Sequence, residues 1–274
     1  MTPEAAMRLA IEQSERVKGA TYPNPPVGAV ILDAGGEVVG VGATEPTGGA
    51  HAEVIAMRRA GKLARGGTAV VTLEPCNHHG RTPPCVDGLL AAGVAQVVYA
   101  VEDPNPIAAG GSARLREAGV GVESGVESAA VAGGPLREWL HKQRTGLPHV
   151  TWKFATSVDG RSAAADGSSQ WITSEAARAD VHRHRGTIEA IIVGTGTVFV
   201  DDPTLTARRP DGSLADRQPL RVVVGEREIS SEANVLNDDT RTMVIRTHDP
   251  HEVIRALSDR TAVLLEGGPT LAGA

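Results

Sequence analysis

The sequence predicts an α/β protein built from two domains. Short apolar segments rich in β-branched residues alternate with helical segments along the first half, which is the pattern of a layered α/β domain. The length of 274 residues suits two domains of ordinary size. A stretch that contains Gly133-Gly134-Pro135 and Gly146-Leu147-Pro148 separates the halves, so we expect domains at 1–146 and 147–274.

The composition is that of a globular protein, with 41% hydrophobic and 22% charged residues. The net charge of −6 disfavours a nucleic-acid-binding surface, which usually carries a basic excess. The sequence has no signal-peptide pattern and no run of about 18 apolar residues, so we expect no association with a membrane. Because both cysteines are assigned to a metal below, we expect a reducing, cytoplasmic location.

The first half begins with an amphipathic helix expected at 3–18, where Thr2 is the N-cap, Pro3 is the first helical residue and Gly19 ends the helix. A hairpin turn at 33–36 joins the first two strands. The elements after the first helix are expected in the order strand 29–32, strand 37–42, helix 51–60, strand 68–73, helix 85–92, strand 96–101, helix 113–118 and strand 120–123. This order predicts a three-layer α/β domain.

Three segments of the first half carry the residue types of a catalytic zinc site. His51 and Glu53 stand in the first turn of an expected helix, and Cys76 and Cys85 each follow a proline. One imidazole and two thiolates supply three ligands of a tetrahedral zinc and leave the fourth position for water. His-x-Glu, Pro-Cys and a second Cys form the signature of zinc nucleobase deaminases, in which the glutamate moves protons. We expect the helix dipole to lower the pKa of Cys85.

Two other interpretations of these residues stay open. Cys76 and Cys85 could form a disulfide. Alternatively, the protein could bind zinc only for stability, with Glu53 as a first-turn acid favoured by the helix dipole. His78 and His79 also suggest metal binding, but adjacent side chains diverge, so we expect at least one of them to be a hydrogen-bonding loop residue.

Polar residues in two loops are candidates for substrate contacts. Asn24 lies in a proline-rich loop before strand 29–32, where the prolines preset φ, although an asparagine in a loop often caps its own turn. Asp103 and Asn105 follow strand 96–101. Ligands of open α/β sheets usually bind at the carboxyl ends of strands, which favours a functional role for this pair.

Four motifs of the first half match one family: Pro-Asn-Pro-Pro-Val-Gly, His-Ala-Glu-Val, Thr-Leu-Glu-Pro-Cys-Asn-His-His-Gly-Arg-Thr-Pro-Pro-Cys and Asp-Pro-Asn-Pro. They resemble the deaminase half of bifunctional riboflavin-biosynthesis deaminase/reductases, which has a cytidine-deaminase-like fold. Cytidine and tRNA adenosine deaminases generally have the shorter Pro-Cys-x-x-Cys. The resemblance implies zinc ligands His51, Cys76 and Cys85, the proton shuttle Glu53, and substrate contacts Asn24, Asp103 and Asn105.

The first half departs from this family at two places. Thr44 stands where the family usually has a histidine, and Gly110-Gly111 lacks the lysine of the family's Gly-Lys-Gly. We expect both departures to loosen contacts with the substrate without affecting the zinc.

The second half has fewer local signals. Residues 124–148 are expected to be a linker around a helix at 136–144. A strand at 150–155, a helix at 175–185 and a buried strand at 188–194 follow. Gly194-Thr195-Gly196 after this strand suggests phosphate near backbone N–H groups, but without a third glycine a plain tight turn is the favoured interpretation.

The motifs from Lys153 to Leu205 and the final Gly267-Gly268-Pro269 resemble the reductase half of the same bifunctional enzymes, whose fold is like dihydrofolate reductase. The resemblance implies that NADPH contacts Ala155, Trp171, Thr197, Asp201 and Gly268. It also implies that the phosphoribosyl substrate contacts Ser169, Arg185, Leu205, Arg208 and Glu266. Arginines suit this role because guanidinium groups bind phosphate in a bidentate manner.

The family's reductase continues past the last residue of this chain, so the resemblance implies a C-terminally incomplete reductase domain. We therefore expect the strand at 263–266 to be uncovered and the reductase to be weakened, because lost burial costs about 25 cal/mol per Å². The family also implies a homodimer when the reductase domain is complete.

The predicted function is a two-step reaction on a small molecule of riboflavin biosynthesis. Zn²⁺-dependent hydrolysis deaminates 2,5-diamino-6-(5-phosphoribosylamino)pyrimidin-4-one, and NADPH then reduces the ribosyl group to ribityl. The alternatives are a cytidine- or tRNA-type nucleobase deaminase and a noncatalytic zinc-stabilised binding protein. The acidic balance and the long Cys–Cys insert disfavour the first, and an open water position on the zinc distinguishes the second.

Overall fold

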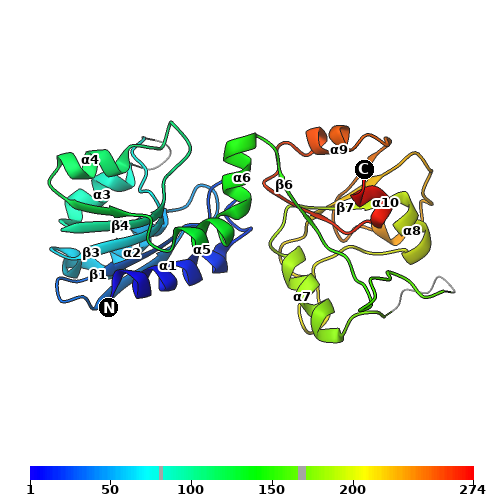
Figure 1. Ribbon diagram of the computed structural model, residues 1–274, viewed down its shortest axis with the longest axis horizontal. Coiled ribbons are helices and arrows are strands. Elements are labelled where there is room, and N and C mark those ends of the chain that lie inside the picture. The colour runs from blue at the N-terminus through cyan, green and yellow to red at the C-terminus, as the bar shows by residue number, and fades with distance from the viewer. Residues whose placement is uncertain (80–82, 166–170) are drawn as a thin grey trace. The chain divides into compact units, whose positions relative to one another are not determined.

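The computed structural model describes residues 1–79, 83–165 and 171–274, which form two compact units, Met1–Thr145 and Gly146–Ala274 (Figure 1). Each unit contains its own five-stranded sheet. None of the helices in the described part of the chain has the length and apolar character needed to cross a membrane.

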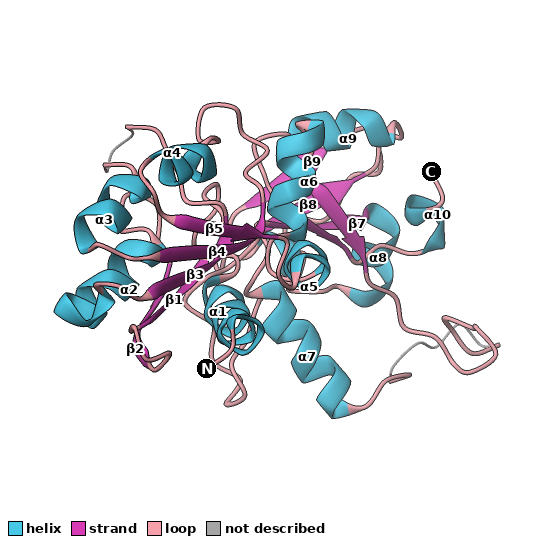
Figure 2. Ribbon diagram, turned by 60° about the vertical axis from the view of Figure 1, so that its left-hand side comes forward, coloured by secondary structure: helices cyan, strands magenta, loops and turns pink. Residues whose placement is uncertain are grey.

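The sheet of the first unit has the order β2-β1-β3-β4-β5, in which β1 is antiparallel to both neighbours and the last three strands are parallel. Helices α2, α3 and α4 cover one face of the sheet, and α1 and α5 cover the other (Figure 2). The strands are β1 (Gly28–Leu32), β2 (Val38–Ala43), β3 (Thr68–Leu73), β4 (Gln96–Val101) and β5 (Gly121–Ser124). The helices are α1 (Pro3–Val17), α2 (Ala52–Ala60), the 3₁₀ turn η1 (Gly61–Ala64), α3 (Cys85–Ala92), α4 (Gly111–Glu117), α5 (Ser128–Gly133) and α6 (Arg137–Thr145).

Local chemistry explains why the first-unit elements form where the sequence predicts them. The Thr2 side chain accepts a hydrogen bond from the Ala5 N–H at 3.3 Å, and Pro3 follows as expected at the start of α1. Strand β1 is buried along its whole length, which matches its apolar sequence. The three-layer arrangement is therefore confirmed. One detail is wrong: His51 is the N-cap of α2, and only Glu53 lies in its first turn.

The expected linker at 124–148 is a second correction. Helices α5 and α6 belong to the first unit, where Val131, Leu136, Trp139 and Leu140 are buried in its main apolar core. Burying these four side chains removes them from water, which is the dominant stabilising contribution to a fold. Gly133-Gly134-Pro135 separate two packed helices, and only Gly146-Leu147-Pro148 stand between α6 and β6, where the second unit begins.

The second unit has a fully parallel sheet with the order β6-β10-β7-β8-β9. Its strands are β6 (His149–Trp152), β7 (Ala190–Gly194), β8 (Leu220–Val224), β9 (Thr242–Ile245) and β10 (Ala262–Leu265). Its helices are α7 (Glu175–Arg185), α8 (Thr195–Asp201), the 3₁₀ turn η2 (Asn234–Leu236), α9 (Pro250–Ala256) and α10 (Pro269–Ala272). The sequence pattern predicted α7 at its observed bounds, but it did not predict β8, β9 or α9.

The expectation that the strand near residue 264 is uncovered is wrong. Strand β10 lies between β6 and β7, and Val263 and Leu264 are fully buried. On one face it packs in a core cluster that includes Val253 and Leu257 from α9 and its following turn. The strand is central because the chain returns to the middle of the sheet after building its far edge.

Candidate active site

The three expected metal ligands of the first unit meet at one point. His51 caps α2, Cys76 lies just after β3, and Cys85 opens α3. The His51 Nδ1 atom is 3.2 Å from the Cys85 Sγ and 3.6 Å from the Cys76 Sγ, and the three ligand atoms all lie within 4.8 Å of one another. The two sulfurs are free thiols, which removes the disulfide alternative.

This geometry fits a tetrahedral zinc ion. Bond lengths of about 2.3 Å to sulfur and about 2.0–2.1 Å to nitrogen place such ligands about 3.6 Å apart. The observed nitrogen–sulfur separations of 3.2 and 3.6 Å are close to that value. His51, Cys76 and Cys85 would hold the ion and leave one coordination position open.

The electrostatics of the two thiols differ from the sequence prediction. The hydrogen bond from the Cys85 thiol, together with the one from His51, lowers the pKa of Cys76 to about 4. The same hydrogen bond to Cys76, together with burial, raises the pKa of Cys85, so the expected lowering by the helix dipole is outweighed. A bound cation would favour the thiolate form of both sulfurs.

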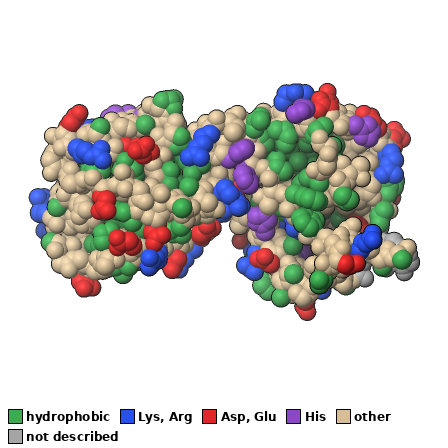
Figure 3. All heavy atoms as spheres, in the orientation of Figure 1, with side chains coloured by type: hydrophobic (Ala, Val, Ile, Leu, Met, Phe, Trp, Pro, Cys, Tyr) green, Lys and Arg blue, Asp and Glu red, His purple; other side chains and the backbone are tan. Residues whose placement is uncertain are grey.

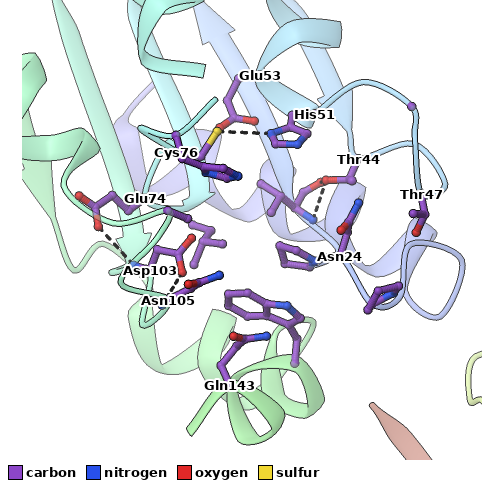
Figure 4. Close-up of a pocket in the computed structure, with 18 of the residues that line it drawn as sticks. Asn24, Thr44, Thr47, His51, Glu53, Glu74, Cys76, Asp103, Asn105 and Gln143 are labelled. Carbon is purple, nitrogen blue, oxygen red and sulfur yellow. Dashed lines mark hydrogen bonds between the residues drawn. The ribbon is translucent and has the colours of Figure 1, made fainter. Parts of the chain in front are cut away.

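Glu53 lies in the first turn of α2 and points toward Cys76 and His51 (Figure 4). Only 4% of the residue is exposed. Burial and the neighbouring Cys76 charge raise the pKa of Glu53, while His51 opposes the shift. A carboxyl group whose pKa lies above its usual range is suited to accept a proton and return it.

A pocket of about 420 Å³ opens over these residues. His51, Glu53 and Cys76 line it together with the expected substrate contacts Asn24, Asp103 and Asn105, and Figure 4 shows the last three around the same cavity. The structure thus brings all the sequence-predicted residues of the first half to one site, where Cys85 belongs to the metal cluster but does not line the pocket.

Backbone contacts hold the candidate substrate residues in place. The Asn24 N–H donates to the Thr21 carbonyl at 2.9 Å, and the Thr21 hydroxyl donates back to the Asn24 carbonyl at 3.0 Å. The Asp103 carboxylate accepts from the Asn105 N–H at 2.9 Å, and the Asn105 side-chain oxygen accepts from the Ile107 N–H at 3.1 Å. Burial raises the pKa of Asp103.

The residues at the two departures from the family pattern have clear contacts, although nothing in the structure explains the missing lysine. The Thr44 hydroxyl lines the pocket but exchanges hydrogen bonds with the Val27 backbone, accepting from its N–H at 3.2 Å. A Cβ atom on Gly111 would lie 1.8 Å from the Pro75 carbonyl oxygen, so α4 can approach this segment only with a glycine there. Thr44 is thus engaged with the β1 end of the sheet, and Gly111 is required for packing.

The pocket is also lined by three residues that the sequence motifs did not indicate. Trp139 and Gln143 lie on α6, and Glu74 lies directly after β3. The first two lie in a segment expected to be a linker, so no local signal pointed to the site. His78 also lines the pocket, and its buried Nδ1 has no hydrogen-bond partner among the described residues. His79 is exposed and lies 4.0 Å from Asp87, outside the metal cluster.

In the second unit, the expected substrate contacts Arg185 and Glu266 pair with each other. Arg185 Nε and Nη2 donate to the two Glu266 carboxylate oxygens at 2.7 and 2.8 Å, and Nη1 donates to the Thr206 carbonyl at 3.0 Å. Lys153 Nζ lies 3.5 Å from the same carboxylate. Burial opposes ionisation of Glu266, but the hydrogen bonds and charges of Arg185 and Lys153 hold its pKa below the usual range.

The other expected substrate residues of this unit lie on one loop after α8. Leu205 is buried and has a left-handed backbone with φ of 52°, which is unusual for a branched residue. Arg208 donates to the Gly212 carbonyl of its own turn at 3.0 Å, so its guanidinium is partly engaged. Ser169 lies outside the described residues.

Most of the expected NADPH contacts follow strands of the second sheet in the chain. Thr197 and Asp201 lie on α8, directly after β7, and Gly268 caps α10 after the neighbouring β10. Ala155 follows β6, and the exposed Trp171 stacks with the Arg178 guanidinium 4.5 Å from its ring centre.

Glycines stand at or just after the carboxyl ends of three adjacent strands of the second sheet. They are Gly194 at the end of β7, Gly225 after β8 and Gly267 after β10. A Cβ on Gly225 would meet the Thr195 hydroxyl at 2.8 Å, so only glycine allows this approach. Ligands of parallel sheets bind at such edges, and the residues present therefore fit a nicotinamide dinucleotide. The sequence pattern missed Gly225 because it missed β8.

Two protein-family models match the chain in succession. The cytidine and deoxycytidylate deaminase zinc-binding region matches residues 1–101, and the RibD C-terminal domain matches residues 148–274. The first match contains His51, Glu53, Cys76 and Cys85, and the second covers nearly all of the second unit.

Curated relatives match almost the whole chain. The riboflavin biosynthesis protein RibD of Mycobacterium tuberculosis H37Rv is 71% identical over 271 residues, which cover 99% of this chain and 80% of that protein. The RibD protein of Escherichia coli K12 is 40% identical, and the match covers 100% of this chain and 84% of that protein.

Solved structures agree with these relatives. RibD of Acinetobacter baumannii has a TM-score of 0.86 at 38% identity, covering 98% of this chain and 82% of that one. A diaminohydroxyphosphoribosylaminopyrimidine deaminase/5-amino-6-(5-phosphoribosylamino)uracil reductase of Thermotoga maritima has a TM-score of 0.88 at 34% identity, with the same coverage of both chains.

Proposed function

This chain belongs to the RibD family of riboflavin biosynthesis, and from that membership we propose that its first unit deaminates 2,5-diamino-6-(5-phosphoribosylamino)pyrimidin-4-one and its second unit reduces the product. It is a bifunctional enzyme with a zinc-binding deaminase domain and an NADPH-dependent reductase domain. We assign residues 1–146 to the deaminase and 147–274 to the reductase. One observation carries the first assignment: the buried Glu53 beside a cluster of one imidazole and two thiols in an open pocket.

The deaminase residues have distinct roles in this proposal. A zinc ion held by His51, Cys76 and Cys85 would supply Lewis-acid chemistry near neutral pH. Glu53 would take up the proton that the attacking water loses and return it to the pyrimidine ring and the departing amine. Asn24, Asp103 and Asn105 hold the pyrimidine in the pocket so that the carbon bearing the amine faces Glu53.

In the reductase, Thr197, Asp201 and Gly268, with Ala155 and Trp171, would hold NADPH, which supplies the hydride when bound. The phosphoribosyl substrate would contact Leu205 and Arg208. The pairing of Arg185 with Glu266 supports a joint role, in which the arginine holds the carboxylate and keeps two N–H groups for phosphate.

Ammonia release from the diaminopyrimidinone phosphate tests the first step. We expect release with the zinc-loaded protein, loss of release after chelation and recovery when zinc is added back. NADPH oxidation with the deaminated product tests the second step. Absence of ammonia release from fully zinc-loaded protein would favour the noncatalytic binding protein, and release from cytidine would favour the nucleobase deaminases.

The distribution of charged side chains disfavours a nucleic-acid substrate. Figure 3 shows acidic and basic side chains interspersed over the visible face of each unit, whereas nucleic-acid binding is usually associated with a basic patch. The substrate is a small molecule. We further propose that the protein works in a reducing, cytoplasmic compartment, since both thiols are needed as ligands. A homodimer stays a prediction that sedimentation can test.

A further inference from the structure

Glu74 is a buried acid of the deaminase pocket to which the mechanism above gives no role. It lies between the end of β3 and Cys76, and only 6% of the residue is exposed. Its Oε2 accepts a hydrogen bond from the Asp103 N–H at 3.3 Å, and its Oε1 accepts one from the Ser112 N–H at 2.9 Å (Figure 4 shows the first).

These two N–H groups mark the ends of the loop that carries the candidate substrate contacts. Asp103 begins the loop after β4 and is itself a contact, Asn105 follows, and Ser112 lies in the first turn of α4. The Glu74 carboxylate therefore binds both ends of the ten-residue segment 103–112. Glu74 itself lies two residues before the metal ligand Cys76.

Backbone contacts join the same two segments but act at other points. The Glu74 N–H donates to the Val101 carbonyl at 2.8 Å, and the Asn77 N–H donates to the Ala108 carbonyl at 3.0 Å. Gly111 packs directly against the Pro75 carbonyl. Among the hydrogen bonds from residues 74–77 in the described structure, the one to the Glu74 side chain is the one that involves Asp103.

The hydrogen bonding of Glu74 favours a structural role in this pocket. Both Glu74 carboxylate oxygens accept hydrogen bonds from backbone N–H groups of the loop, so the carboxylate is directed at the loop backbone and is anchored to it. Glu53 lies beside the metal cluster and has no such pair of backbone donors at its carboxylate in the described structure. The two acids of the pocket therefore have different surroundings and different tasks.

We propose that Glu74 is a positioning residue. Its side chain sets the distance between the metal cluster and the candidate substrate contacts Asp103 and Asn105. This inference rests on the proposed deaminase function. Charged acceptors form stronger hydrogen bonds than neutral ones, so a carboxylate holds two amides more firmly than an amide oxygen would. If Asp103 and Asn105 are no longer held at the right distance from the metal site, their contacts with the substrate weaken, and the loss appears first in substrate binding.

The test compares Glu74→Gln and Glu74→Ala with Glu138→Gln. Glu138 is an equally buried acid of the same unit, paired with Lys18 and Arg137 and absent from the pocket lining. We expect all variants to bind zinc with unchanged stoichiometry. For both Glu74 variants the KM for the diaminopyrimidinone should rise about tenfold or more while kcat changes less, since the loss is in binding. Glu138→Gln should keep the wild-type KM.

Amide hydrogen exchange gives a readout that does not depend on activity. In Glu74→Gln the Asp103 and Ser112 amides should exchange at least about tenfold faster, with strand β3 protected as before. Unchanged KM and unchanged exchange would overturn the proposal. A fall in kcat alone, with loss of one limb of the pH profile, would overturn it in favour of proton transfer. If the wild type releases no ammonia, the deaminase proposal is wrong, and the exchange rates alone decide whether Glu74 holds the loop.

Discussion

At the scale of single residues, two buried glutamates differ in their pKa because their neighbours differ. Glu53 is buried beside Cys76 and His51, and its pKa is raised, whereas the buried Glu266 of the second unit is paired with Arg185 and its pKa is lowered. Both are glutamates with little exposure. Their neighbours decide whether the acid is available to carry a proton or is held ionised.

The first prediction concerns Glu53. Glu53→Gln should lower kcat for ammonia release by about 10²–10⁴-fold, because it removes the general acid–base group. Zinc content should stay the same, since the ligands are His51, Cys76 and Cys85. Because burial already disfavours the ionised carboxylate, the neutral amide should not lower the free energy of unfolding. Metal analysis, denaturant unfolding and an ammonia assay check these outcomes, and turnover near the wild-type rate would remove Glu53 from its role.

The second prediction concerns acid stability. The folded-state pKa of Glu266 is lowered, so the carboxylate stabilises the second unit above its unfolded pKa of about 4.3 and loses this contribution as pH falls through the folded value. Between about pH 5 and pH 3, the wild type should therefore lose more unfolding free energy than Glu266→Gln. Urea unfolding at several pH values measures the difference.

The control for Glu266 is Asp216→Asn in the exposed pair with Arg209. Surface ion pairs contribute about 0–1 kcal/mol, so this variant should follow the wild-type pH dependence. Identical acid profiles for Glu266→Gln and the wild type would show that the Arg185 pair does not hold the carboxylate in its ionised form.

At the scale of elements, the site depends on the ends of helices and strands. His51 and Cys85 sit at the starts of α2 and α3, and Cys76 sits just beyond the end of β3. End positions allow His51 and Glu53, two residues apart, to meet one pocket, although such residues diverge along a helix interior. Helix α6 adds Trp139 and Gln143 from a segment whose glycines and prolines suggested a linker.

The third prediction tests whether α6 is part of the deaminase domain. Leu140→Ala should lower the unfolding free energy of the first unit by about 2–5 kcal/mol, because Leu140 is fully buried in its core. The exposed Arg144 on the same helix offers the control, since Arg144→Ala should change stability by less than about 0.5 kcal/mol. Denaturant unfolding measures the unfolding free energy of both variants. Equal values for Leu140→Ala and Arg144→Ala would show that this segment is a linker and not part of the domain core.

At the scale of the whole molecule, the chain consists of two units with separate cofactor sites. The described metal cluster lies wholly within Met1–Thr145, and the glycine-lined strand ends lie wholly within Gly146–Ala274. Ligands that bind a folded state stabilise it by mass action. Each cofactor should therefore act on the stability of its own unit.

The fourth prediction follows from this division. Chelation should lower the melting temperature of the first unit and abolish ammonia release, and added zinc should restore both. NADPH at 100 times its Kd should stabilise the second unit by about 2.7 kcal/mol, with or without the chelator. Calorimetry that resolves the two transitions measures this. A shift of both transitions by one cofactor would show that the units are energetically coupled.

The sequence by itself determined the chemistry of the deaminase site and most of the first domain. Metal ligands are recognised by residue type and spacing, so His51, Cys76 and Cys85 were identifiable before any coordinates. Strand β3 and helices α3 and α7 have their predicted bounds because apolar periodicity and terminal residues act locally. In the second unit the sequence pattern missed β8, although its residues are mostly apolar and buried, and it missed the four-residue β9, which is only partly buried.

Only the tertiary structure decided which polar groups form hydrogen bonds or ion pairs within the protein and which of them line a pocket. The pairing of Arg185 with Glu266 and the contact of Glu74 with Asp103 join residues 81 and 29 positions apart. The rise in the pKa of Cys85 comes from Cys76, nine residues away in the chain. Such effects depend on burial and on neighbours that the fold brings together, and local sequence patterns carry no information about either.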